Sequence, residues 1–187
     1  MTVILVEGLG DAQAVPILLG KNGKHQDVRC IDMRGKSNIV RMKTGFEETI
    51  KRQLALGAEE FVILLDRDVS FPPYASLHQE EIGMRERSEI LQREIQRTVH
   101  VFWAIRAYES WLIGGLRRGD AYCGLKRFAG SVSGDTQASP EHPKEWLKQH
   151  LSARDYNPWT QVCLTKNVDW GKARRRNRSL RDFLSFF

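Results

Sequence analysis

Two acidic positions of this sequence directly follow apolar runs, and both could hold a divalent cation. Glu7 ends the run at residues 2–6, Asp66 ends the run at 61–65, and Asp68 lies two residues further on. Carboxylate oxygens are the ligands that Mg²⁺ and Mn²⁺ prefer in proteins. A carboxylate that ends a buried strand has to be solvated or paired, because an unpaired buried charge is costly. These residue types at these positions favour metal-assisted chemistry.

The elements that would position these acids alternate between strands and helices. Short runs rich in apolar and β-branched residues predict strands at 2–6, 28–33, 61–65 and 100–105. Helical patterns lie between them, at 11–19, 37–57 and 84–99. This alternation predicts an α/β fold, a mainly parallel four-stranded sheet flanked by helices, in which ligands collect at the carboxyl ends of the strands. We expect residues 1–106 to form this core and residues 107–187 to be a helical extension packed on it.

Composition narrows the class of protein. The chain has 187 residues, of which 41% are hydrophobic and 28% charged, as is ordinary for one globular unit. No run of about 20 apolar residues predicts a membrane span, and the first residues do not resemble a signal peptide. Cys30, Cys123 and Cys163 are odd in number and far apart, which predicts neither a disulfide framework nor a zinc site and favours the cytoplasm. The oligomeric state does not follow from the sequence.

Basic residues are in excess, and the excess is concentrated near the C-terminus. Lys and Arg together number 29 against 23 Asp and Glu, giving a net charge of +6. Such a field attracts phosphates, although a basic surface without any partner is the alternative. The candidate nucleic-acid contacts are Arg106, Lys144, Lys166, Lys172, Arg174, Arg175, Arg176 and Arg178.

Several stretches resemble a known family. ILVEGLGDAQAVPILL and VILLDRDV resemble the TOPRIM fold that topoisomerases, primases and the overcoming-lysogenization-defect nucleases share. AYESWLIGG, PKEWLKQHL and KARRRNRSLRDFLSFF resemble, more narrowly, the small TOPRIM-like proteins of the domain-of-unknown-function family numbered 4276. The chain departs from that pattern at Tyr108, where a proline or small residue is expected, and at RNRSLRDF, where Ser-x-Ser-Phe is expected.

The resemblance implies roles for five acids. Glu7 matches the glutamate that serves as metal ligand or general acid/base, and Asp66 and Asp68 match the metal-holding aspartates of the catalytic site. Asp11 matches a second acid after the glutamate, and Glu109 matches an acid that completes the metal shell. Two Mg²⁺ or Mn²⁺ ions held by these carboxylates could neutralise charge and activate water. The expected function is therefore that of a metal-dependent nuclease or phosphoryl-transfer protein acting on nucleic acid.

The sequence also contains weaker signals of other functions. GLGDAQA resembles a dinucleotide-binding loop but lacks the third glycine, and no Walker lysine indicates an NTPase. LLDRDVS resembles the strand end of haloacid-dehalogenase-like phosphatases, but no later aspartate pair follows. The main alternative is a non-catalytic or partner-dependent TOPRIM-like subunit. The resemblance implies that its partner would be an ABC-class or AAA-class ATPase of a bacterial defence or mobile-element system.

Overall fold

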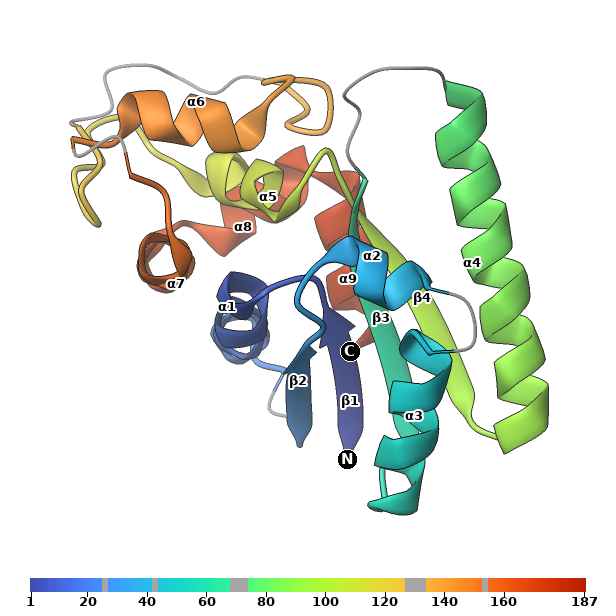
Figure 1. The fold of residues 1–187 in the computed structure, drawn as a ribbon. Helices are drawn as coiled ribbons and strands as arrows, with labels where there is room; N and C mark the ends of the chain where they lie inside the picture. Colours follow the sequence, from blue (N-terminus) through green and yellow to red (C-terminus); the bar gives the residue numbers. More distant parts are fainter. Residues whose placement is uncertain (25–26, 42–43, 68–73, 127–133, 153–154) are drawn as a thin grey trace.

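All four strands run parallel in one sheet, in the order β2-β1-β3-β4 (Figure 1). The strands are β1 (Thr2–Val6), β2 (Val28–Asp32), β3 (Glu60–Arg67) and β4 (Thr98–Ile105). The computed structural model describes residues 1–24, 27–41, 44–67, 74–126, 134–152 and 155–187, without the side chains of 74–78. The prediction of an α/β fold with a parallel four-stranded sheet is confirmed.

The two central strands are buried along almost their whole length. Every residue of β1 is buried, and so are Phe61 to Asp66 of β3. Both strands are continuously apolar rather than alternating, because helices cover both faces of a parallel sheet. The acidic strand ends are thus the points where the chain leaves the core.

One face of the sheet is covered by three helices. They are α2 (Lys36–Val40), α3 (Phe46–Ala55) and α4 (Tyr74–Ile95). Phe46 and Ile50 are fully buried there, as the predicted helical spacing requires. The prediction of a single helix over 37–57 was wrong, because α2 ends at Val40 and α3 begins only at Phe46. A Cβ on Gly45 would lie 2.3 Å from the carbonyl oxygen of Ile39, so this break needs a glycine.

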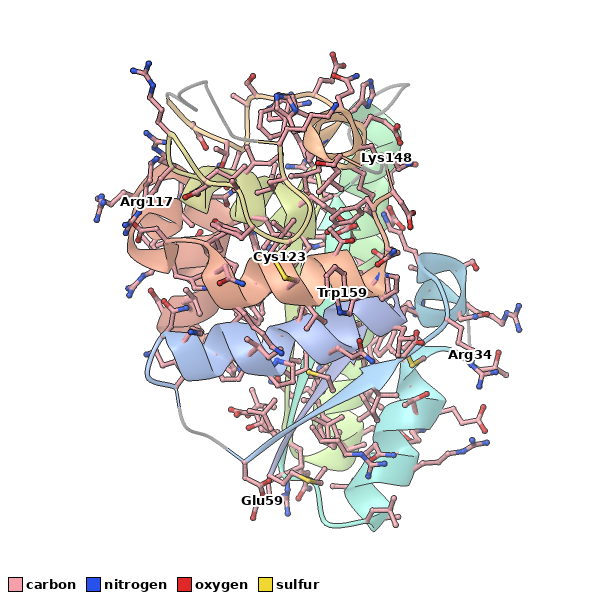
Figure 2. The ribbon with its side chains drawn as sticks, turned by 90° about the vertical axis from the view of Figure 1, so that its left-hand side faces the viewer. Arg34, Glu59, Arg117, Cys123, Lys148 and Trp159 are labelled. Atoms are coloured by element: carbon pink, nitrogen blue, oxygen red, sulfur yellow. A yellow bond between two sulfur atoms is a disulfide. The ribbon has the colours of Figure 1, made fainter. Side chains whose placement is uncertain are left out.

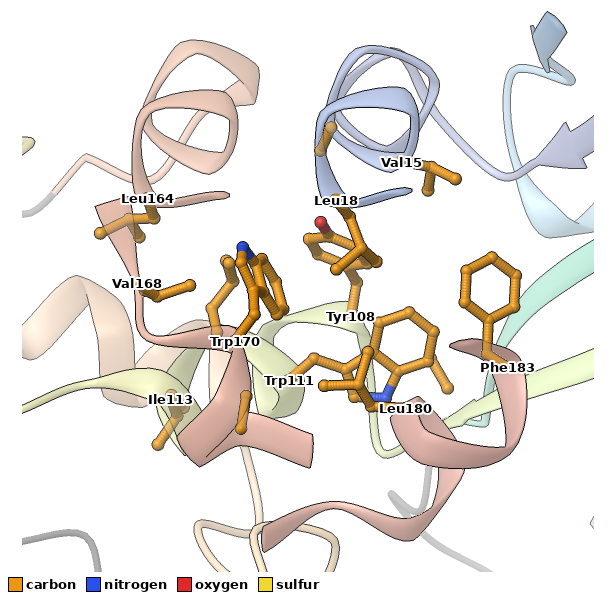
Figure 3. Close-up of a cluster of buried hydrophobic side chains, with 14 of the residues drawn as sticks. Val15, Leu18, Tyr108, Trp111, Ile113, Leu164, Val168, Trp170, Leu180 and Phe183 are labelled. Carbon is orange, nitrogen blue, oxygen red and sulfur yellow. The ribbon is translucent and has the colours of Figure 1, made fainter. Parts of the chain in front are cut away.

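The other face is covered by six helices of the described chain. They are α1 (Leu9–Lys21), α5 (Tyr108–Gly115), α6 (Pro143–His150), α7 (Pro158–Asn167), α8 (Trp170–Arg176) and α9 (Arg178–Phe186). Figure 3 shows their shared core, in which Leu18 of α1, Trp111 of α5 and Phe183 of α9 belong to one cluster of buried side chains. The C-terminal helices therefore pack on α1 and the sheet through a common core.

Side-chain caps begin three of these C-terminal helices. Asn157, Asp169 and Asn177 each accept a hydrogen bond from a backbone N–H in the first turn of the helix that follows. The α5 and α8 helices come close at Gly115, where a Cβ would lie 2.9 Å from the Asp169 carbonyl oxygen. These features fix how the chain folds back over α5.

A disulfide joins Cys123 to Cys163, across 40 residues of sequence. The prediction that the cysteines form no disulfide was wrong. The two cysteines are far apart in the sequence, but α7 packs beside the loop that follows α5. As a result, their Cα atoms lie 5.7 Å apart. Figure 2 shows this disulfide on α7, which lies along α1. Cys30 is free.

None of the described helices is long and apolar enough to cross a membrane.

Candidate functional site

A charged residue of the candidate site lies at or shortly after the carboxyl end of each strand. Glu7 follows β1, Lys36 begins the helix after β2, Asp66 lies near the end of β3, and Glu109 is in the first turn after β4. The strand order reverses direction between β1 and β3, which is the position where open parallel sheets bind ligands. Charged side chains thus gather at the carboxyl edge of the sheet.

Asp66 connects these elements. Its backbone N–H donates to Glu7 Oε1 at 2.7 Å, and its carbonyl oxygen accepts from Lys36 Nζ at 3.1 Å. Its carboxylate accepts the backbone N–H of Tyr108 at 2.9 Å and lies 3.1 Å from Lys144 Nζ. Only 9% of its side chain is exposed. These contacts fix the orientation of the carboxylate.

Lys144, from the first turn of α6, reaches a second carboxylate as well. Its Nζ lies 3.9 Å from Glu109 Oε2, and the Glu109 side chain is 2% exposed. That oxygen is buried and has no hydrogen-bond partner in the structure. The Lys144 side chain is half exposed, so it closes the carboxylate cluster on the solvent side.

The carboxylates repel one another. Burial and the charge of Asp66 raise the pKa of Asp11 to about 7 and that of Glu109 to about 8. Burial opposes the charge of Lys144, but Glu109 and Asp66 hold its pKa above the ordinary value. The site therefore has more buried carboxyl groups than Lys144 alone can keep ionised.

Asp11 is positioned by a contact between α1 and α7. The helix α1 begins before the predicted start at residue 11, with Gly8 as its N-cap and Asp11 in its first turn. Its carboxylate accepts a 2.6 Å hydrogen bond from Gln161 Nε2 of α7. A Cβ on Gly10 would lie 2.1 Å from the other amide atom, Gln161 Oε1, so a larger residue there would require the Gln161 side chain to turn away from Asp11.

Tyr156 forms part of the buried wall beside Glu109. Its hydroxyl is buried beside the Glu109 carboxylate, and no other hydrogen-bond partner is found for it among the described residues. Burial, the charge of Glu109 and a hydrogen-bonding interaction with its carboxylate raise the pKa of Tyr156 well above its usual value. The phenol therefore stays protonated and remains available as a hydrogen-bond donor facing the cluster.

Four of the five predicted acids lie together at this edge of the sheet. They are Glu7, Asp11, Asp66 and Glu109. Asp68 lies outside the described residues. Sequence reasoning missed Lys36, Gln161 and Tyr156; of these, Lys36 had a recognisable signal, since it closely follows a predicted strand.

The predicted basic residues do not form one group. Lys144 pairs with the carboxylates, whereas Arg106 donates to the carbonyl oxygens of Gln137 and Glu141 and so holds the segment before α6. Lys172 donates to the carbonyl oxygen of Leu116. The remaining predicted residues are exposed at Lys166, Arg174, Arg175 and Arg178 and half-buried at Arg176.

The donor set is that of a hard cation. Among the described residues, no three or more His, Cys, Asp or Glu side chains are arranged to hold a metal ion. The mutual repulsion of Asp11, Asp66 and Glu109 nevertheless fits Mg²⁺ or Mn²⁺. Lys144 now supplies the positive charge at this position.

Comparison of the chain with protein-family models, with curated proteins and with solved structures gives no match. The resemblance to TOPRIM-like proteins therefore rests on the residues quoted above.

Proposed function

We propose that this chain is a TOPRIM-like protein that cleaves phosphodiester bonds of nucleic acid with the help of Mg²⁺ or Mn²⁺. The observation that carries the proposal is the convergence of Asp11, Asp66 and Glu109 around the ammonium group of Lys144. Structural ion pairs seldom include so many buried carboxylates, whereas metal-assisted phosphoryl transfer requires several carboxylates to hold the metal ions. The resemblance to TOPRIM-like proteins implies that Glu7 is the catalytic glutamate.

The residues divide into those that would hold the metal and those that position them. Asp11, Asp66, Glu109 and Glu7 would hold one or two ions, which would neutralise charge on the phosphate and activate water. Glu7 also fixes the end of β3 by accepting the Asp66 N–H. Tyr156 excludes water from one side of Glu109.

Lys144 is the basic residue placed to meet a phosphate. Its ammonium lies against Asp66 on the solvent side of the cluster and the side chain is half exposed, so a substrate phosphate oxygen could replace a carboxylate as its partner. Exposed Lys166, Arg174 and Arg175 would contact the nucleic-acid backbone away from the reacting phosphate.

The test is cleavage of single-stranded and duplex DNA and RNA by purified protein with Mn²⁺, Mg²⁺ or EDTA. We expect metal-dependent cleavage that Glu7→Gln and Asp66→Asn each abolish. Glu94→Gln, an exposed residue on the far end of α4, is the matched charge control and should cleave like wild type. Cleavage that survives both acid substitutions would refute the assignment.

A partner-dependent or non-catalytic subunit is the second candidate, and one contact favours it. Lys144 already neutralises part of the cluster, as it would in a site that needs no metal. Isothermal titration with Mn²⁺ distinguishes a metal site from a degenerate one, and Mn²⁺ binding without cleavage would indicate the partner-dependent subunit. An active site should bind Mn²⁺, and Lys144→Met should bind it more tightly; a degenerate site should bind none in either protein.

Nucleic-acid binding can be tested separately from cleavage. Fluorescence anisotropy in EDTA should show an affinity that falls steeply with salt, because cationic contacts release counterions. Arg174→Glu/Arg175→Glu should weaken it, whereas Arg93→Glu/Arg97→Glu should not. Equal loss in both pairs would indicate only a general charge effect.

A further inference from the structure

The two edges of the sheet differ in how they are protected. The β2 edge carries exposed Arg29 and lies next to exposed Asp27, and charged side chains of this kind discourage pairing with other strands. The β4 edge has the composition of a central strand, with Val101, Phe102 and Trp103 in succession, yet all three are only half-buried. Within the part of the chain that the structure describes, β4 is therefore the less protected edge.

Backbone hydrogen bonds show which groups of β4 point outward. Arg106 N–H donates to the Arg67 carbonyl oxygen, so even-numbered residues face β3. The N–H groups of Val99 and Ile105 point away from β3 and donate to the side chains of Gln92 and Ser179. By the same alternation, the N–H and C=O groups of Val101 and Trp103 face outward between these two capped positions.

These outward groups line a groove. It has a volume of about 460 Å³ and lies between β4 and α4. Val99, Val101 and Trp103 form one wall, and Ile82, which is 42% exposed, belongs to the other. The groove thus offers an extended chain both backbone hydrogen bonds and apolar contacts.

We propose that two copies of this chain pair through β4, antiparallel, about a two-fold axis at Phe102. Antiparallel pairing around this residue sets Val101 of each copy opposite Trp103 of the other. Each such pair exchanges two N–H···O=C bonds, so all the outward groups between the capped positions are satisfied at once. An isologous contact of this kind closes on itself and leaves only the charged β2 edges of the joined sheet unpaired.

Charges on the α4 wall suit a second copy. Glu81 is already paired with Arg67, which leaves exposed Arg85 and Glu89, one helical turn apart, lining the groove. This wall offers opposite charges, and two antiparallel copies of α4 can match them reciprocally. The contact does not depend on the function proposed above.

Disulfide trapping tests the pairing directly, in a Cys30→Ser background. Residues opposite at the axis have Cα atoms about 4.5 Å apart, within the reach of a disulfide. We expect Phe102→Cys to form a covalent dimer on mild oxidation. His100→Cys, on the same face of the strand but away from the axis, is the matched control and should stay monomeric.

Light scattering across a concentration series gives the second readout. Wild type should dimerise, and Val101→Pro should shift the midpoint to at least tenfold higher concentration by deleting an outward N–H. This proline spares the bonds to β3 and suits an edge strand. Cys30→Pro deletes an outward N–H of β2 and should leave the dimer unchanged, with circular dichroism confirming that both variants fold.

Two results would overturn the proposal. One is a wild-type protein that stays monomeric at every concentration. The other is a dimer that Val101→Pro leaves intact and that Phe102→Cys does not trap, since this dimer would use a different surface.

Discussion

The backbone N–H of Asp66 donates a 2.7 Å hydrogen bond to the carboxylate of Glu7, so the ends of β3 and β1 are tied together by a side chain. These two strands flank the point where the sheet reverses its strand order. Glu7 thus has a structural task in addition to any chemical one, and the two can be separated by substitution.

Glu7→Gln should preserve the hydrogen bond from the Asp66 N–H, and Glu7→Ala should remove it. The glutamine carbonyl oxygen can still accept the Asp66 N–H, whereas alanine leaves a buried donor unpaired at a cost of about 1–3 kcal/mol. Urea unfolding should therefore show Glu7→Gln close to wild type and Glu7→Ala clearly less stable. Equal losses in the two variants would contradict the structural role of this hydrogen bond.

Lys144→Met should destabilise the protein through the acids that it leaves behind. Removing one partner of a buried ion pair is costly, but Lys144 is half exposed, so we expect a loss of about 1–2 kcal/mol. Adding Glu109→Gln should recover part of this loss, because it removes the orphaned charge. Additive losses in the double-mutant cycle would show that the two residues do not interact.

Gly10→Ala should disrupt the contact between α1 and α7. The added methyl group meets Gln161 Oε1, so the Gln161 side chain has to turn away and lose its hydrogen bond to Asp11, and we expect a loss of about 1 kcal/mol. Combining it with Gln161→Ala makes room and should restore stability relative to Gly10→Ala alone. Thermal unfolding is sufficient as a readout, and Gly20→Ala, where the added Cβ meets no neighbouring atom, is the control.

Acid should destabilise the fold through His100. Burial lowers its pKa, although the charge of Glu60 opposes this. The unfolded chain then binds the proton more readily, so stability is lost as the pH falls through about 6.5. The difference in unfolding midpoint between pH 7.5 and 5.5 should be smaller in His100→Gln than in wild type. An NMR titration that gives His100 a pKa above 6.5 would contradict this sign.

Thiol counting should find one reactive cysteine in the unfolded, unreduced protein and three after reduction. Reduction should also lower the melting temperature, because the disulfide restricts the unfolded chain. For a loop of this length, that restriction adds at most about 4 kcal/mol to the free energy of unfolding. Cys123→Ser should unfold like the reduced wild type. Three thiols without reductant would show that the disulfide does not form in solution and would suit the predicted cytoplasmic location.

The sheet and its acidic edge could be predicted because their signals are local. Glu7 and Asp66 stand directly after continuous apolar runs, and both properties are visible in a few residues. The resemblance to TOPRIM-like proteins supplied Asp11 and Glu109. The structure places these four acids together but does not test their chemical role.

The rest of the site depends on how distant helices dock. Gln161 meets Asp11 across 150 residues, and Tyr156 faces Glu109 from the segment before α7, which no local pattern indicates. The helix α7 itself was not predicted, although Asn157 followed by Pro158 is a recognisable helix start. Polar contacts of this kind follow from tertiary packing rather than from spacing.

The disulfide between Cys123 and Cys163 turns the intervening chain into a covalent ring. This ring contains α6 and therefore Lys144, together with Tyr156 and Gln161. The parts that enclose the acids from the solvent side thus form one linked unit, whereas the acids themselves belong to the open chain. A protease cut anywhere within the ring would leave the molecule in a single covalent piece, which reduction would then separate into two.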